Sequence, residues 1–165
     1  MNCTTHSTHF GRFRETRGYT LIELMTVVTV LSVTTMMAVP NFLTMTSRTS
    51  LQRATKDLHS NLNLARMTAM NRNTTVTVGM AVANGHVTAT FTDRTGTVVM
   101  PAQVMPSELT GHGGVATVGF TSLGLRAGGG TSNQTMTLTN RQGVTYEIQV
   151  TPAGRARWCA TSPCT

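Results

Sequence analysis

Near the C-terminus, two arginines stand at alternate positions in the segment Gly154-Arg155-Ala156-Arg157-Trp158-Cys159. In an extended strand, side chains two residues apart point to the same side, so Arg155 and Arg157 would face one way and Trp158 the other. Guanidinium groups stay charged and donate hydrogen bonds in a fork that fits phosphate oxygens. The pair is therefore a candidate for binding two phosphates along one nucleic-acid backbone. The same pattern also suits a solvated edge strand whose charges prevent aggregation, and the spacing alone does not separate the two interpretations.

A second unusual residue is the carboxylate Glu23, which lies inside an apolar run. From Tyr19 to Val39, a stretch of 21 residues, no other side chain is charged. About 20 apolar residues cross the hydrocarbon core of a bilayer, so the run predicts a membrane helix, although five threonines make it only moderately hydrophobic. A carboxylate in such a helix is costly and usually has a partner. If the chain were cut after Gly18, the new amino group of Tyr19 would lie one helical turn away.

The other reactive side chains do not suggest catalysis. The carboxylates Asp57, Asp93, Glu108 and Glu147 are scattered along the chain, and no Ser/His/Asp or Cys/His pattern stands out. The histidines show no zinc-ligand spacing. We therefore expect no enzyme activity, no metal and no cofactor.

Two glycine-rich stretches, Gly111–Gly114 and Gly124–Gly130, lack the Gly-Lys-Ser/Thr ending of a phosphate-binding P-loop. We expect both to be flexible loops between strands. The second loop could still present the charge of Arg126.

Cys159 and Cys164 lie close together near the C-terminus, with Pro163 between them to help the chain turn. In an oxidising compartment they are expected to form a disulfide. The chain-entropy estimate for so small a loop is only about 2 kcal/mol, so its main effect would be to fix the C-terminus. A metal site is the weaker interpretation because two cysteines are too few ligands.

The heptapeptide Gly18-Tyr19-Thr20-Leu21-Ile22-Glu23-Leu24 resembles the cleavage site of type IV prepilins and type II secretion pseudopilins. The resemblance implies that residues 1–18 are a basic leader, which a prepilin peptidase removes after Gly18. It also implies N-methylation of Tyr19, where the family usually has Phe. Glu23 would then neutralise the N-terminus of a neighbouring subunit during filament assembly.

The C-terminal part resembles one group within this family. Gly154-Arg155-Ala156-Arg157 is similar to the Gly-Arg-x-Arg motif of FimT-type minor pilins, which belong to the GspH/FimT group and are implicated in DNA binding during natural transformation. Phe120-Thr121-Ser122-Leu123-Gly124, followed by a threonine-rich hairpin, also resembles that group. The resemblance implies a long helix packed on a two-sheet β domain.

The elements that would position these residues follow from periodicity. Past Pro40, where we expect a bend, apolar residues recur at steps of three and four and mark one face of a helix that ends near Asn71. These residues are Leu51, Ala54, Leu58, Leu62, Ala65 and Ala69. After Asn73 the period changes to two, which is typical of half-buried strands. We expect strands in residues 75–78, 87–91, 97–100, 115–120, 135–139 and 144–150, with turns at 93–96 and 140–143.

The predicted fold class is therefore α+β: a long N-terminal helix, with a transmembrane half and an amphipathic half, packed on an antiparallel β domain of two sheets. The predicted divisions are the cleaved leader 1–18, the helix 19–72 with its membrane or filament-core segment 19–39, and the globular β domain 73–165. The full chain has a net charge of +7. Without residues 1–18 it keeps ten basic and five acidic side chains, a net charge of about +5 that favours anionic partners.

Together these features predict a minor type IV pilin that binds extracellular DNA without sequence preference, through phosphate contacts, for uptake in natural transformation. Gly154, Arg155 and Arg157 would form the site, with Arg126 and Arg141 as further contacts. The other predicted partners are neighbouring pilins, the prepilin peptidase and, before assembly into a pilus outside the cell, the inner membrane. The alternative is a structural subunit without DNA binding: a GspH-like pseudopilin of a type II secretion system, or a minor pilin that only primes assembly.

Overall fold

The computed structural model describes residues 18–160 and 164, without the side chains of residues 37–41. It contains two compact units, one ending at Pro40 and the other beginning at Asn41. A continuous helix, α1 (Leu21–Asn71), runs through the boundary. The predicted leader lies outside the described residues except for Gly18, and the predicted bend at Pro40 stays a prediction. Among the described residues, no helix has the length and apolarity expected of a membrane span.

In the first unit, the start of α1 shows why its sequence forms a helix. Thr20 acts as the N-cap: its hydroxyl accepts a hydrogen bond from the backbone N–H of Glu23 at 3.3 Å. The Thr-x-x-Glu spacing is that of a capping box, and the carboxylate in the first turn favours the positive end of the helix dipole. The hydroxyls of Thr26, Thr29 and Ser32 each donate to a carbonyl three or four residues earlier. These polar groups are thus satisfied within the helix itself.

In the second unit, the predicted apolar face of α1 is confirmed. Leu51, Leu58 and Leu62 are completely buried, and Ala54, Ala65 and Ala69 are buried with them. Polar contacts fix the helix at its edges. The hydroxyl of Ser47 donates to Gln142 at 2.6 Å and accepts from Asn140 at 3.1 Å, which ties α1 to the turn after β6.

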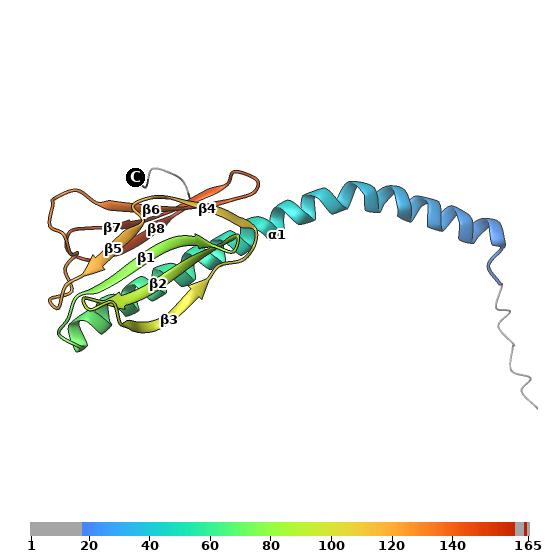
Figure 1. Cartoon of the computed structure of the whole chain (residues 1–165). Coiled ribbons are helices and arrows are strands. Elements are labelled where there is room, and N and C mark those ends of the chain that lie inside the picture. Colours follow the sequence, from blue (N-terminus) through green and yellow to red (C-terminus); the bar gives the residue numbers. More distant parts are fainter. Residues whose placement is uncertain (1–17, 161–163, 165) are drawn as a thin grey trace, which may run out of the picture. The chain divides into compact units, whose positions relative to one another are not determined.

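The strands form two antiparallel sheets, as predicted, and each sheet has four strands (Figure 1). The first sheet has the order β3-β2-β1-β5 and the second has the order β4-β6-β7-β8. The strands are β1 (Val76–Ala83), β2 (His86–Asp93), β3 (Val98–Val104), β4 (Leu109–Gly114), β5 (Thr117–Phe120), β6 (Gln134–Asn140), β7 (Thr145–Val150) and β8 (Ala156–Cys159).

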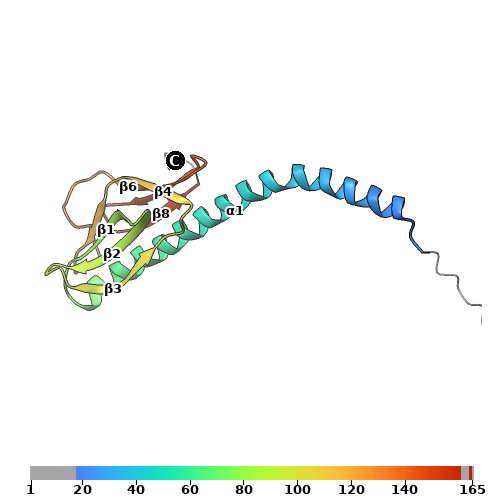
Figure 2. The same ribbon diagram turned by 45° about the vertical axis from the view of Figure 1, so that its right-hand side comes forward.

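One hydrophobic core joins the helix to both sheets. Along the strands, large apolar residues alternate with threonines, so one face of each sheet is buried and the other is polar. Phe91 and Phe120 from the first sheet and Ile148 from the second are fully buried in this core. The C-terminal half of α1 runs along the strands (Figure 2), so the fold class is α+β with two sheets.

The structure corrects one prediction about the glycine-rich stretches. Gly111–Gly114 is not a flexible loop, because it belongs to the edge strand β4, which pairs with β6. At Gly113, a Cβ would meet the Oγ1 atom of Thr137 at 2.6 Å, and at Gly114, where φ is 73°, it would collide with a backbone carbonyl. Glycine is therefore required for close strand approach here, and a sequence of glycines gives no alternating pattern that would reveal a strand.

Both predicted turns are confirmed. In the β6–β7 hairpin, the Asn140 N–H donates to Val144 O at 3.1 Å, and Gly143 takes a φ of 75°. In the β2–β3 turn, Gly96 has a φ of 82° and the Asp93 side chain accepts hydrogen bonds from Thr95 and Thr97.

Candidate nucleic-acid interface

The two arginines of the C-terminal motif lie on β8, the edge strand of its sheet, and on the turn before it. Arg157 pairs with Gln149 of β7, and Trp158 pairs with Ile148. Arg155 and Arg157 are exposed, whereas Ala156 and Trp158 are half-buried against the core. This alternation is the one expected of an extended segment, and it puts both guanidinium groups on the solvent side of β8.

Gly154 is fixed by both its conformation and its surroundings. Its φ is 74°, in the left-handed region that favours glycine. It is also buried, and a Cβ at this position would collide with the carbonyl oxygen of Gly124. The glycine of the motif therefore shapes the backbone that carries Arg155, and we find no surface through which it would contact a ligand.

The turn that contains Gly154 has a counterpart in the loop after β5, and we call the two segments, Thr121–Leu125 and Thr151–Arg155, the twin turns. In each, the first N–H donates to the last carbonyl, at 2.8 and 3.0 Å. In each, the glycine N–H donates to the threonine carbonyl, at 2.8 and 2.9 Å, and the threonine Oγ1 accepts from the last N–H, at 3.3 and 3.2 Å. The two glycines have nearly the same φ, 72° and 74°, and lie against each other.

Arg66 of α1 holds the twin turns together. Its Nε donates to Gly124 O at 2.7 Å and its Nη2 donates to Ala153 O at 3.3 Å. A further bond comes from the residue after the first turn: the Arg126 N–H donates to Pro152 O of the second turn at 3.1 Å. The helix thus positions the backbone just before Arg155, and it brings another positive charge to the same end of the domain.

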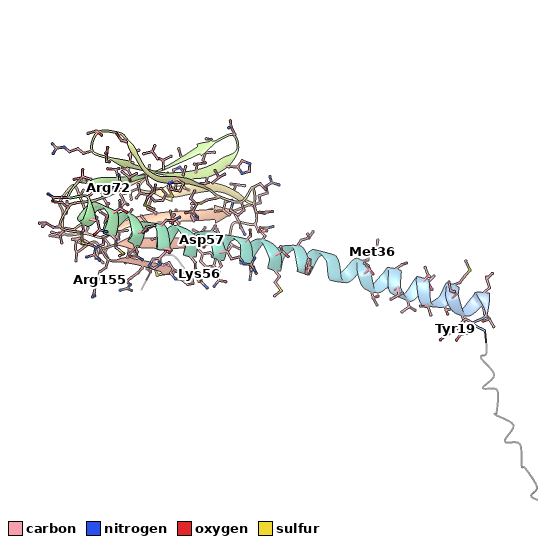
Figure 3. All side chains as sticks on the ribbon, turned by 90° about the horizontal axis from the view of Figure 1, so that it is seen from below. Tyr19, Met36, Lys56, Asp57, Arg72 and Arg155 are labelled. Carbon is pink, nitrogen blue, oxygen red and sulfur yellow. A yellow bond between two sulfur atoms is a disulfide. The ribbon has the colours of Figure 1, made fainter. Side chains whose placement is uncertain are left out.

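The helix α1 also contacts the C-terminal segment next to the twin turns. We call this contact the seam; it consists of Lys56, His59 and Arg66 of α1 and residues 153–158. Lys56 Nζ lies 5.3 Å from the centre of the Trp158 ring, a cation–π contact. His59 Nε2 lies 3.1 Å from the carbonyl oxygen of Ala156. Figure 3 labels Lys56 and Arg155 on the same margin of the domain. Sequence reasoning missed the seam residues of α1 because about a hundred residues separate them from β8.

Arg126 was predicted to be an exposed phosphate contact, but its side chain is buried. Only 7% of its surface is exposed. Its Nη2 group donates to the carbonyl oxygens of Gly129, Gly130 and Ser132, at 2.8, 3.0 and 3.1 Å. The glycine-rich loop therefore wraps around the guanidinium group, which orders the loop and takes Arg126 away from the surface. We correct its expected role from a phosphate contact to a structural one.

Arg141 is exposed, but it precedes β7 whereas Arg155 follows it. Six residues of β7 separate these ends, a distance of about 20 Å at 3.3 Å per residue. The structure thus brings Arg155 and Arg157 together and leaves Arg141 at the opposite end of the sheet.

The remaining predicted sites lie at the two ends of the described chain. Tyr19 is 82% exposed, next to Gly18 and one helical turn before Glu23. At the other end, Cys159 and Cys164 are joined by a disulfide, with their Cα atoms 5.6 Å apart. Among residues 18–160 and 164, no three His, Cys, Asp or Glu side chains are grouped so that they could hold a metal ion.

Comparisons with known proteins agree with this architecture. Residues 54–154 match the family described as type II transport protein GspH, and residues 14–39 match the prokaryotic N-terminal methylation motif. Two crystal structures of the type IV minor pilin FimU from Pseudomonas aeruginosa have a similar fold, each at 18% sequence identity. The first match has a TM-score of 0.55 and covers 73% of this chain and 99% of the FimU chain. The second has a TM-score of 0.53 and covers 70% of this chain and 100% of the FimU chain. A comparison with curated protein sequences found no match.

The GspH match extends from the buried face of α1 to Gly154 in the second twin turn, and so includes most of the second unit and ends just before Arg155. The methylation motif covers the predicted cleavage site and the apolar run after it. The chain therefore belongs to the GspH family and is a type IV minor pilin or pseudopilin of the GspH/FimT kind.

Proposed function

We propose that this protein is a minor type IV pilin that captures extracellular DNA through Arg155 and Arg157. The observation that carries the proposal is the exposure of both guanidinium groups on one side of an edge strand. The turn before them is fixed by Gly154 and Arg66, so the first arginine sits on a rigid backbone. Because such contacts are made to phosphates, binding is independent of sequence and weakens as salt rises.

In this proposal the N-terminus serves assembly. A prepilin peptidase removes residues 1–18, Tyr19 is methylated, and Glu23 pairs with the N-terminus of a neighbouring pilin. The exposed position of Tyr19 and the location of Glu23 in the first helical turn support these roles. The precursor would be held in the inner membrane by residues 19–39 until the subunit enters the pilus.

The test is a fluorescence-anisotropy titration of the full chain, in a nonionic detergent, against a short labelled duplex. The Arg155→Gln/Arg157→Gln variant is expected to bind at least about tenfold more weakly, a loss of about 1.4 kcal/mol. The slope of log affinity against log salt should fall by about 1.8, since each neutralised phosphate contributes about 0.9 on duplex DNA.

The matched control is Arg94→Gln/Arg141→Gln, which removes the same charge from exposed arginines in two other turns. It should keep most of the affinity. An equal loss in both variants would mean that overall charge, and not the β8 surface, governs binding. The control also tests the predicted contribution of Arg141.

The second candidate function is that of a structural pseudopilin in a type II secretion system, which the description of the matched GspH family favours. A structural pseudopilin would have the same cleavage site, the same Glu23 and the same fold. Folded wild-type protein that fails to bind DNA even at low salt would support this function and reject DNA capture.

A further inference from the structure

Two side chains of the seam, Lys56 and Trp158, form a column with Tyr146 of β7. Lys56 Nζ lies 5.3 Å from the centre of the Trp158 ring. Trp158 in turn stacks with Tyr146 of β7, with ring centres 6.1 Å apart and an angle of 29° between the planes. The column thus begins with a cation and continues through two aromatic rings. Both rings are half-buried, so packing against the core holds them in place.

Tyr146, the last member of the column, also lines an open pocket. Its volume is about 390 Å³, in the range of small-ligand sites. Tyr146 supplies the only aromatic side chain among the residues that line it, and the others come from one face of α1. The lining consists of Thr44, Met45, Arg48, Thr49, Gln52 and Tyr146. The pocket therefore offers an aromatic surface together with a cation and an amide side chain, groups that can hydrogen-bond to the edge of a flat polar ring.

The charges along this side of the molecule connect the pocket with the proposed phosphate contacts. Arg48, Lys56 and Arg66 follow one another along α1. The last two contact Trp158 and Ala153 of the C-terminal segment, and the same segment carries Arg155 and Arg157 at its edge. Between Arg48 and Arg66 the helix rises about 27 Å. That length corresponds to about eight stacked nucleotides at 3.4 Å each. Asp57 is the one carboxylate on the described helix between these residues.

We propose that the seam and its pocket bind single-stranded DNA, with one unpaired base stacked on Tyr146. This inference rests on the proposed function, because Arg155 and Arg157 hold the backbone of the same strand. Proteins that bind single strands combine a basic groove with aromatic platforms, and each stacked base adds affinity with little sequence preference. A base inside a duplex is already stacked and cannot enter the pocket without leaving the helix. The pocket therefore selects single strands, or frayed ends, over intact duplex.

The experiment uses the full chain in a nonionic detergent and two probes, a short oligothymidylate and an intact duplex of the same length. Trp158 is the only tryptophan in the sequence, so tryptophan fluorescence, excited selectively over tyrosine, reports on the column. We expect the oligothymidylate to quench this fluorescence at saturation and the duplex to quench it much less. For the single strand, the slope of log affinity against log salt should be about 0.7 for each phosphate contact.

Two substitutions at Tyr146 separate stacking from folding. Tyr146→Leu should weaken oligothymidylate binding by about tenfold and leave duplex binding within about twofold. Tyr146→Phe keeps the ring and should bind both probes like the wild type. Arg48→Gln provides a second test on an exposed side chain whose loss does not disturb the core, and it should weaken only single-strand binding.

The outcomes distinguish this inference from the proposed function. If Tyr146→Leu and Arg48→Gln bind both probes like the wild type, or lose both equally, the pocket does not select single strands and the inference is wrong. In that case the loss of binding in Arg155→Gln/Arg157→Gln would still support DNA capture. If the wild type binds neither probe, DNA capture itself is rejected.

Discussion

At the residue scale, Gly154 meets two requirements that no other residue type can meet. Its φ of 74° is strained for any side chain, and a Cβ would collide with Gly124 O. Gly154→Ala should therefore lower the free energy of unfolding by more than about 2 kcal/mol, because backbone strain and a forced shift of the partner turn add together. Urea denaturation followed by circular dichroism measures the change.

Gly128 provides the matched control. It has a φ of 88°, but no heavy atom lies within 4 Å of the point where a Cβ would stand, so Gly128→Ala carries the strain without the collision. Its cost should be about 1 kcal/mol. Equal costs for the two alanine variants would show that the contact between the twin turns does not constrain the motif.

At the scale of one element, the β2–β3 turn depends on the ionised form of Asp93. The hydroxyl of Thr95 and the backbone N–H groups of Thr97 and Thr95 donate to its carboxylate, and together with the charge of Arg72 they hold its pKa below the ordinary value of 3.8. Because the folded pKa is lower than the unfolded one, the stabilisation is present above about pH 4 and is lost as the pH falls through the folded pKa.

Asp93→Ala should therefore lower stability at neutral pH and make stability less sensitive to acid below about pH 4. The measurement is the urea midpoint between about pH 2.5 and pH 6, where this carboxylate titrates. Glu108→Ala, which removes an exposed carboxylate from the loop after β3, is the control and should keep the acid sensitivity of the wild type. If the urea midpoint of Asp93→Ala fell with acid as steeply as that of the wild type, ionised Asp93 would not stabilise the β2–β3 turn.

At the scale of the second unit as a whole, one core connects α1 to both sheets. Leu62 is completely buried in it, whereas Leu64, two residues later, is 49% exposed. Leu62→Ala should cost about 2–5 kcal/mol, and Leu64→Ala less than about 1 kcal/mol. Because the core is continuous, we expect helix and sheet signals to be lost in the same transition. Separate transitions in far- and near-ultraviolet circular dichroism would contradict a single core.

Much of this architecture follows from local patterns in the sequence. The buried face of α1 could be predicted because Leu51, Leu58 and Leu62 recur with helical spacing, and the β6–β7 hairpin because Asn140 and Gly143 have distinct turn chemistry. The alternation of Arg155 and Arg157 predicted their shared exposure for the same reason. Each of these features depends on residues close together in the chain.

The features that could not be predicted depend on contacts between distant segments. The composition of the glycine-rich loop does not show that its carbonyls surround Arg126, and the glycines of β4 carry no periodicity. The column joins Lys56 to Tyr146 and Trp158, which follow it by about ninety and about a hundred positions, and no local pattern indicates that they meet. Without side-chain periodicity or a known contact, the sequence led us to predict that Arg126 is exposed, and it gave no indication of the pocket beside Tyr146.

The twin turns have a practical consequence for protein engineering. The segment Gly154–Arg157 is short enough to be transplanted onto another β hairpin, but its shape depends on Gly124 from a different loop and on Arg66 from the helix. A transplanted motif without these two supports would carry the same charges on a backbone free to take other conformations. A portable version of this surface would therefore need three chain segments, and designers should copy the pair of turns together with the arginine that joins them.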